Sequence, residues 1–232
     1  MLKFLGRGSA FTDNHNCAFF KFKNDLVFID FPMTAFLKLK NIGLNNLVGD
    51  VNKIYVLVTH THCDHIGGIP MLIHYAYHVW KVPVIIAVPS EEIEENLRYY
   101  IGVIEGCYDE VYTLIYARNL PFVKNVIKTS HSWSLDGRCF GYCLNIEDKN
   151  VVYTGDTNTL APYLPYLDKG TILYTEISNY KAPMHLCIED VLYKLKQFTN
   201  MGISVYLMHI DDEDAIKKEI AGTNIQIAEL YN

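Results

Sequence analysis

The sequence has no hydrophobic run long enough to cross a bilayer. Its longest apolar stretches have the length of a strand, whereas a membrane-spanning helix needs about 20 apolar residues. A secretory leader is not expected either, because the segment 1–7 has no long apolar core before a small-residue cleavage site. We therefore predict a cytoplasmic protein without membrane contact.

Cysteines are few and scattered, and basic residues do not concentrate anywhere. The six cysteines lie far apart, which in a chain of this kind indicates reduced thiols rather than a disulfide framework. Net charge is −6, and lysines form only short pairs. Because a protein that grips long nucleic acid presents a concentrated basic face, no such partner is expected. A small anionic substrate neutralised by a metal is still allowed.

Apolar residues make up half of the sequence, so the chain can build a large core. Its 232 residues fit a single domain spanning 1–232. Strands are expected at 2–5, 17–23, 26–30, 54–58, 82–88, between 110 and 126, and at 138–146, 151–154, 171–177 and 204–208. Helices are expected at 34–40, from 67 to 78, from Ser90 onward, at 188–198 and at 213–220. This order predicts an α/β sandwich of two β-rich halves, each covered by helices.

A cluster of metal-ligand side chains follows one apolar strand. After Ile54–Val58 the chain reads His60-Thr61-His62-Cys63-Asp64-His65. Three imidazoles and one carboxylate on a tight turn can point at one place. Imidazole nitrogen and carboxylate oxygen are the usual ligands of Zn²⁺, so the turn predicts a metal site.

Three further candidates stand alone, each at the end of a predicted strand: His131, Asp156 and His209. Taken singly, each has an ordinary explanation as a turn residue, a helix cap or a strand-end histidine. Their order and contexts, added to the first cluster, match the five signature elements of the metallo-β-lactamase superfamily, which the sequence resembles.

The resemblance implies a four-layer αββα sandwich with two metals at one edge between its sheets. By carry-over, one metal would be held by His60, His62 and His131, the other by Asp64, His65 and His209, and Asp156 would bridge them. Two metals about 3.5–4 Å apart can activate a water and clamp the attacking and leaving oxygens. His62 stands where redox-active di-iron relatives tend to carry a glutamate. We therefore expect two Zn²⁺ per chain, with Mn²⁺ as the alternative, and hydrolysis.

Two more polar residues resemble the RNase Z-like phosphodiesterase branch. Glu176 ends a strand, and His185 lies in Ala182-Pro183-Met184-His185-Leu186, which is expected to open the amphipathic helix. In that branch such a histidine lies near the leaving oxygen and the acid orients it. With Asp64, they are the predicted catalytic residues. The alternative is that His185 is a helix-start histidine with no ligand.

The chain departs from the tRNA-processing members of that branch. Those bacterial enzymes carry a protruding arm between the histidine that matches His131 and the aspartate that matches Asp156. Here only residues 132–155 separate the two. The compact relatives that open cyclic mononucleotides, including viral ones that disarm pyrimidine cyclic-nucleotide immunity, are the most similar.

Candidate substrate contacts are Ser9, His15 and Asn16 in the first loop (residues 6–16) and Tyr112 in a tyrosine-rich stretch (residues 99–116). Aromatic rings can stack bases, as Phe11 could, but most of these tyrosines fit core or dimer contacts equally well. Relatives in this branch are often dimers, so a homodimer is expected.

The sequence thus favours a binuclear zinc phosphodiesterase acting on a small anionic nucleotide, above all a cyclic mononucleotide such as cCMP, cUMP, cAMP or cGMP. The alternatives are an RNase Z-like RNA endonuclease, a thioester or lactone hydrolase of the same fold, and a metal-dependent protein that binds nucleotides without cleaving them. A thiolate leaves without an acid, so a thioesterase would not need His185.

Overall fold

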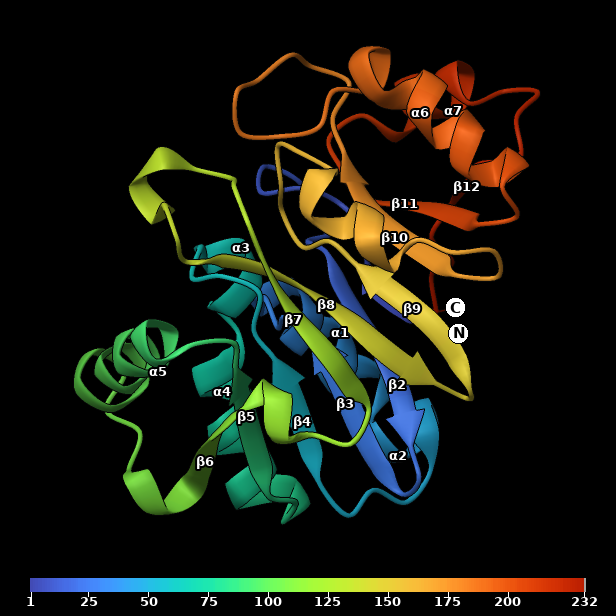
Figure 1. Ribbon diagram of the computed structural model, residues 1–232. Helices are drawn as coiled ribbons and strands as arrows, with labels where there is room; N and C mark the ends of the chain where they lie inside the picture. The colour runs from blue at the N-terminus through green and yellow to red at the C-terminus, as the bar shows by residue number, and fades with distance from the viewer. Residues whose placement is uncertain (232) are drawn as a thin grey trace.

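Two six-stranded sheets form the centre of the protein, in a computed structural model that describes residues 1–231 (Figure 1). The first sheet has the order β1-β2-β3-β4-β5-β6 and the second β12-β11-β10-β9-β8-β7. The first contains β1 (Lys3–Gly6), β2 (Cys17–Phe22), β3 (Asp25–Ile29), β4 (Ile54–Leu57), β5 (Val84–Val88) and β6 (Tyr112–Tyr116). The second contains β7 (Val123–Thr129), β8 (Cys139–Ile146), β9 (Lys149–Tyr153), β10 (Ile172–Ile177), β11 (Ser204–Ile210) and β12 (Gln226–Ile227).

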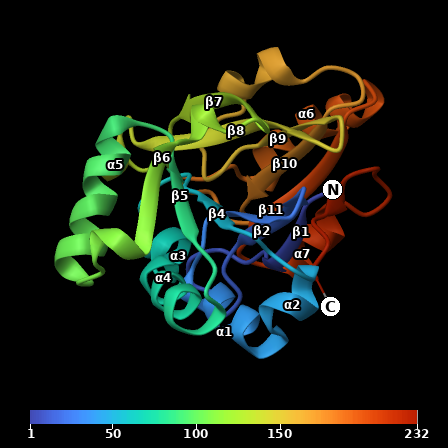
Figure 2. The same ribbon diagram turned by 90° about the horizontal axis from the view of Figure 1, so that it is seen from below.

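Helices cover the outer face of each sheet, which gives the four layers seen in Figure 2. The first sheet carries α1 (Met33–Ile42), α2 (Leu44–Val48), α3 (Cys63–Ile66), α4 (Ile69–Tyr75) and α5 (Glu91–Arg98). The second carries α6 (Ile188–Asn200) and α7 (Glu213–Glu219). Within residues 1–231, none of the helices has the length and apolar character of a bilayer span.

The apolar core lies in three layers, because alternate strand residues face opposite sides of a sheet. In β3, Leu26 and Phe28 pack under the helices of the first sheet, while Val27 and Ile29 face the second sheet. Leu173 of β10 packs against α6 and α7 in the third layer. Burying one such side chain fully contributes about 1.5–3 kcal/mol, so these layers fix the two sheets against each other.

The strands that carry candidate ligands all end at one edge. In the first sheet β3, β4, β5 and β6 run parallel, and in the second β9, β10, β11 and β12 do so. β7 pairs antiparallel with β8, and β8 pairs antiparallel with β9, so β7 runs in the same direction as β9. Residues that follow these strands therefore gather where the two sheets meet, which is the usual place for a ligand in an α/β sheet.

Most predicted elements are present, with local differences. The helix predicted to reach residue 78 is α4 followed by the π-helical segment Ala76–Trp80, and a second π-helical segment, Tyr99–Ile104, extends α5. The prediction that residues 182–186 open α6 is wrong, because these residues form a turn before the helix. β12 was not predicted, because two residues are too few for a strand pattern.

Candidate metal centre

The histidine-rich turn joins β4 to α3. His60 and His62 lie on the extended segment, and His62 precedes the first residue of α3. The backbone N–H groups of His65 and Ile66 donate to the carbonyl of His62 at 3.0 and 3.1 Å, which closes one helical turn. Asp64 and His65 are therefore brought round to the side on which His60 and His62 lie.

Three imidazoles form the first ligand group. The Nε2 atom of His60 is 3.0 Å from Nδ1 of His62, and Nε2 of His131 is 3.4 Å from the same Nδ1. His131 arrives from the end of β7, in the other sheet. These three nitrogen atoms lie close enough together to hold one ion.

A carboxylate and two imidazoles form the second group. Oδ2 of Asp64 lies 3.3 Å from Nε2 of His65 and 3.4 Å from Nε2 of His209. His209 belongs to β11, so this group also combines both sheets. The three atoms again lie within reach of one ion.

One oxygen atom lies between the two groups. Oδ2 of Asp156 is 3.9 Å from Nε2 of His60 and 3.7 Å from Nε2 of His131 in the first group. It is 3.4 Å from Nε2 of both His65 and His209 in the second. Oδ2 of Asp156 is therefore close to the ligand atoms of both groups.

The spacing and the proton positions both fit metal. Four ligands about 2.0–2.2 Å from a tetrahedral ion are roughly 3.3–3.6 Å apart, close to the separations of these atoms. His65 donates from Nδ1 to Asp30 at 2.7 Å, and its buried Nε2 faces the carboxylate oxygens of Asp64 and Asp156 at 3.3 and 3.4 Å. A metal ion at this place would take up the Nε2 lone pair of the neutral imidazole and offset the charge of the buried carboxylates.

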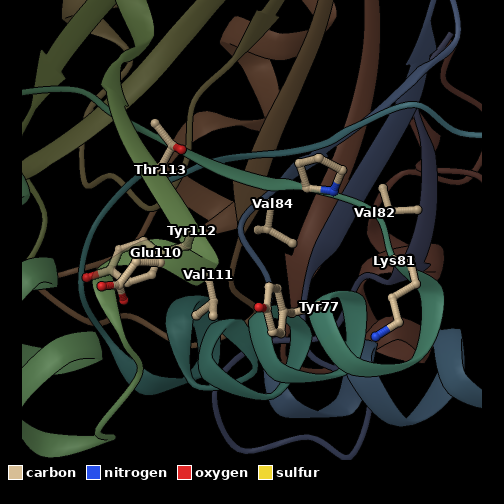
Figure 3. A pocket seen from close by; sticks show the side chains of 9 residues that line it. Tyr77, Lys81, Val82, Val84, Glu110, Val111, Tyr112 and Thr113 are labelled. Atoms are coloured by element: carbon tan, nitrogen blue, oxygen red, sulfur yellow. The ribbon is translucent and has the colours of Figure 1, made fainter.

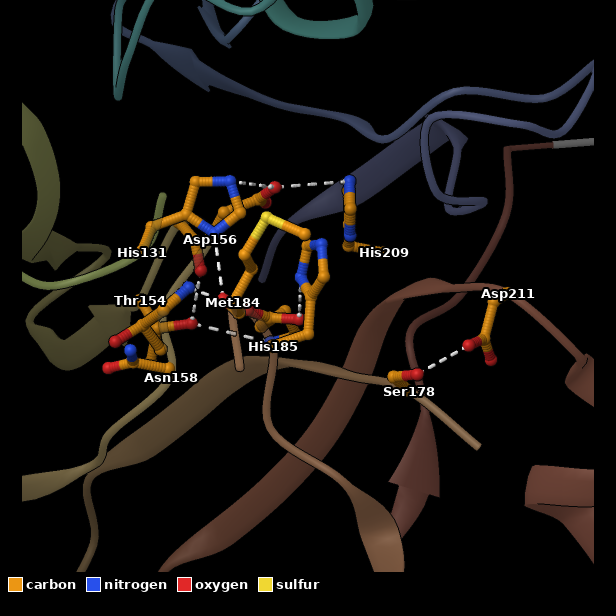
Figure 4. A network of polar contacts seen from close by, with 12 residues as sticks. His131, Thr154, Asp156, Asn158, Ser178, Met184, His185, His209 and Asp211 are labelled. Carbon is orange, nitrogen blue, oxygen red and sulfur yellow. Dashed lines mark hydrogen bonds and ion pairs between the residues drawn. The ribbon is translucent and has the colours of Figure 1, made fainter. Parts of the chain in front are cut away.

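Other imidazole protons are fixed in the same way. His131 donates from Nδ1 to the carbonyl of Met184 at 2.8 Å (Figure 4), and Nδ1 of His60 lies 3.0 Å from the hydroxyl of Thr59. In each case the metal-facing Nε2 keeps its lone pair. Such outer partners orient ligating histidines and raise their basicity.

Asp30 is the outer partner that sequence reasoning missed. Its carboxylate accepts from His65 and from both the backbone N–H and the hydroxyl of Thr59, at 2.7–2.8 Å. It is fully buried and follows the apolar strand β3, just as His60 follows β4. That shared position at a strand end was the available signal.

The buried charges favour neutral ligands in one group and a cation in the other. Burial lowers the pKa of His60 well below its usual value and that of His131 to about 4, so both are neutral, as ligation requires. Burial would also lower the pKa of His65, but the carboxylates of Asp156, Asp30 and Asp64 raise it well above its usual value. Three acids around one imidazole thus favour positive charge at this place.

Backbone strain marks the same edge. His209 has φ of 51° and Asp30 has φ of 58°, both in the left-handed region that non-glycine residues rarely occupy. Such a conformation costs on the order of 1–3 kcal/mol and persists where the surrounding structure enforces it, often at functional sites.

A histidine and an acid lie beside the metal-ligand cluster. Nδ1 of His185 donates to Oε2 of Glu176 at 2.8 Å, while Oε1 of Glu176 accepts from the backbone N–H of Thr157 at 2.6 Å. The His185 ring lies next to those of His131 and His209, with centroids 4.8 and 5.4 Å apart. Glu176 therefore joins the turn that carries Asp156 to His185.

The environment shifts the pKa of both members of this pair upward and keeps His185 charged. Burial raises the pKa of Glu176 to about 7. Burial alone would lower the pKa of His185, but the hydrogen bond and charge of Glu176 raise it to about 9. With Nδ1 bonded to Glu176, the imidazolium has one remaining proton, on Nε2, to give away.

A cavity of about 360 Å³ opens next to His185 and His209. Its walls come from the first loop, through Ser9 and Phe11, and from the segment that carries Tyr180. Phe11 is fully exposed and Tyr180 is 62% exposed. Both rings are thus free to contact a bound molecule.

The first loop is fixed to the metal-bearing strand. The N–H of Ser9 donates to the carbonyl of Ile210 at 3.0 Å, and the N–H of Ile210 donates to that of Arg7 at 2.8 Å. The guanidinium of Arg7 binds both carboxylate oxygens of Glu213 at 2.7–2.8 Å. The loop therefore keeps its place directly beside His209.

The structure places the predicted substrate contacts of the first loop in different surroundings. Ser9 lines the cavity. The His15 ring is half-buried, with Nε2 3.1 Å from the carbonyl of Ala10 within the loop. Asn16 is buried and donates to the hydroxyl of Tyr153 at 2.7 Å, so the structure does not leave it free for a substrate.

Tyr112 is not brought to the metal-ligand cluster within one chain. It is buried among core residues of the first sheet and lies 3.4 Å from Asp109 through its hydroxyl. It lines a different cavity, with Tyr77, Lys81 and Val84, that contains none of the seven candidate ligands (Figure 3). Its surroundings within one chain are those of a core residue, and its contact with a substrate stays a prediction.

Comparison with known proteins identifies the family of this chain. The sequence matches the family described as Anti-Pycsar protein Apyc1 over residues 1–229. The chain belongs to that family. It is a metal-dependent hydrolase, and family membership together with the His/Asp cluster supports the degradation of nucleotides. No curated protein matches the sequence of this family member.

Solved structures share the fold at low sequence identity. The metallo-β-lactamase fold protein YhfI from Bacillus subtilis has a TM-score of 0.72 and 15% identity, covering 98% of this chain and 94% of its own. A diphosphatase of the PhnP family has a TM-score of 0.70 and 15% identity, covering 100% of this chain and 95% of its own. Human tRNase Z, short form, has a TM-score of 0.62 and 15% identity, covering 92% of this chain and 93% of its own. The predicted metallo-β-lactamase fold is thus confirmed.

Proposed function

We propose that this family member is a binuclear zinc phosphodiesterase that hydrolyses cyclic mononucleotides. The observation that carries the proposal is the position of Oδ2 of Asp156 between two ligand groups, with the His185–Glu176 pair on the same edge. Manganese is the alternative metal, because nitrogen and oxygen ligands bind both.

Each group of side chains has a distinct part in the reaction. The first ion would be held by His60, His62 and His131, the second by Asp64, His65 and His209, and Asp156 would be shared. When bound, the two ions supply an activated water and neutralise charge on the phosphate. His185 gives its Nε2 proton to the departing sugar oxygen, which is otherwise a poor leaving group. Glu176 holds Nδ1 and stabilises the charged imidazole.

The cavity beside His185 supports a small nucleotide. A volume of about 360 Å³ lies at the lower end of the usual range for small-molecule sites. Phe11 and Tyr180 offer rings on which a base can stack, worth roughly 1–3 kcal/mol each. No lysine or arginine lies among the residues that line this cavity, so the walls favour a compact ligand over a long phosphate backbone.

The predicted homodimer stays a prediction. Exposed apolar side chains at Tyr99, Val103, Ile104 and Tyr108 are compatible with a contact between copies. Tyr112 would meet a substrate only through such a contact.

The test pairs metal analysis with a hydrolysis screen. The purified protein should contain two zinc or manganese ions per chain and should open cyclic mononucleotides. Aryl phosphodiesters, thioesters and lactones serve as the comparison substrates. Preference for a thioester or lactone would assign the fold to a different hydrolase, and binding of intact cyclic nucleotides with two metals but no turnover would make the protein a binder.

A further inference from the structure

The loop that carries His185 is closed at its base. It comprises residues 179–186 and is called here the 179–186 loop. The N–H of Ser178 donates to the carbonyl of Leu186 at 2.8 Å, and the N–H of Ile188 donates to that of Ser178 at 2.9 Å. His185 thus lies one residue inside the closure.

Asp211 is the side chain that holds this base. Its Oδ2 accepts from the hydroxyl of Ser178 at 2.5 Å (Figure 4). Its Oδ1 accepts from the backbone N–H of Asn179 at 2.9 Å. Oδ1 also accepts from the N–H of Asp212 at 2.7 Å. Both oxygens are therefore engaged by the protein.

The location of Asp211 connects the loop to the metal-bearing strand. Asp211 follows β11 by one residue and His209 by two, whereas Ser178 follows β10. The two strands are parallel neighbours, paired through Ile177 and Ile210. The carboxylate thus connects two strand ends. The end of β10 leads into the loop that carries His185, and the end of β11 carries the candidate metal ligand His209.

We propose that Asp211 is a positioning residue, which fixes the 179–186 loop so that His185 faces the leaving group. The catalytic consequence rests on the proposed phosphodiesterase function, but the hold on the loop does not. Glu176 orients the ring through one bond, and Asn158 and His131 bind the carbonyls of Pro183 and Met184 near the end of the loop. The contacts of Asp211 fix the start of the loop, so their loss would let the ring shift from its position.

The first experiment uses leaving-group dependence, which a general loss of structure would not alter. Asp211→Ala should lower kcat on a cyclic mononucleotide by on the order of tenfold, and by less on an aryl phosphodiester whose leaving group needs no proton. Metal content should stay at the wild-type value. Asp211→Asn should recover part of kcat, since its amide can accept from Asn179 and donate to Ser178.

Coupling to His185 provides the decisive control. In a His185→Ala background, Asp211→Ala should cost little further activity, because the group that it positions is already absent. Additive losses, or equal losses on the two substrates, would overturn the proposal. Asp214→Ala is the matched control, since this exposed acid on α7 forms an ion pair with Lys217 at 3.8 Å.

The second experiment does not depend on activity. The 179–186 loop contains one trypsin site, after Lys181, whose side chain is exposed. Both Asp211→Ala and Ser178→Ala should speed cleavage there several-fold, while Asp214→Ala should not. Unchanged cleavage in both variants would refute the hold on the loop. Faster cleavage in a protein that hydrolyses no phosphodiester would keep that hold and reject only the proposed reaction.

Discussion

Single atoms decide the chemistry of this site, and Oδ2 of Asp156 is the clearest case. It lies within 3.9 Å of four imidazole nitrogens that belong to two ligand groups. Its partner oxygen, Oδ1, is buried without a hydrogen bond. A buried carboxylate with so little compensation is stable only when positive charge is close.

His185→Ala tests the proton donor. We expect kcat on a cyclic mononucleotide to fall by roughly 10²–10⁴-fold, because an alkoxide cannot leave readily without a proton. The fall should be much smaller on an aryl phosphodiester, and both metals should remain. Steady-state kinetics on the two substrates, with metal analysis of the variant, measure these effects; a metal-depleted variant would instead make His185 a ligand.

Asp30→Ala tests the outer partner of His65. Loss of the 2.7 Å bond frees the His65 ring, so metal affinity should fall by about 10–100-fold. Competition with a chelator measures the affinity. Asp25→Ala, at the opposite end of β3, is the control and should bind metal normally.

At the scale of elements, the site is made by the turns that leave the strands. Gly155 lies between β9 and Asp156 with φ of 59°, and a Cβ atom there would be 2.6 Å from the carbonyl oxygen of Phe140. Only glycine accepts both constraints, so the backbone before Asp156 is fixed by the packing of β8.

Gly155→Ala should therefore disturb both stability and metal binding. The strained φ alone costs on the order of 1–3 kcal/mol, and the clash must move either β8 or Asp156. Gly170→Ala is the matched control, because Gly170 has φ of 89° but nothing within 4 Å of its Cβ position. Thermal unfolding and metal content of the two variants separate strain from clash; equal metal content in both would contradict the argument.

The sequence predicted what depends on local pattern. Buried strands such as β4 and β11 show as apolar runs with candidate ligands at their ends, and the resemblance to the metallo-β-lactamase superfamily supplied the set of seven. The Ser90 cap of α5 was also predictable, and its hydroxyl accepts from Ile93 as expected. Asp211, by contrast, gave no signal, because its partner Ser178 is 33 residues away and the two meet only through strand pairing.

For the whole molecule, metal removal is the sharpest test. The site contains Asp30, Asp64 and Asp156 within contact of one imidazole, so the empty cluster gathers negative charge. At metal concentrations about 100-fold above Kd, binding stabilises the folded state by about 2.7 kcal/mol. Chelation should thus lower Tm by on the order of 5–10 °C, measured by calorimetry, and added zinc or manganese should restore it. An unchanged Tm would show that the cluster holds no ion.

The chain passes from the first sheet to the second only once among the described residues, between β6 and β7. Both ligand groups draw on either side of that crossing: His60 and His62 with His131, and Asp64 and His65 with His209. An ion in either group would consequently be a reversible cross-link between halves that are otherwise joined by apolar packing and by polar contacts such as the Arg7–Glu213 ion pair. Metal supply would then govern whether the two halves open separately or as one cooperative unit.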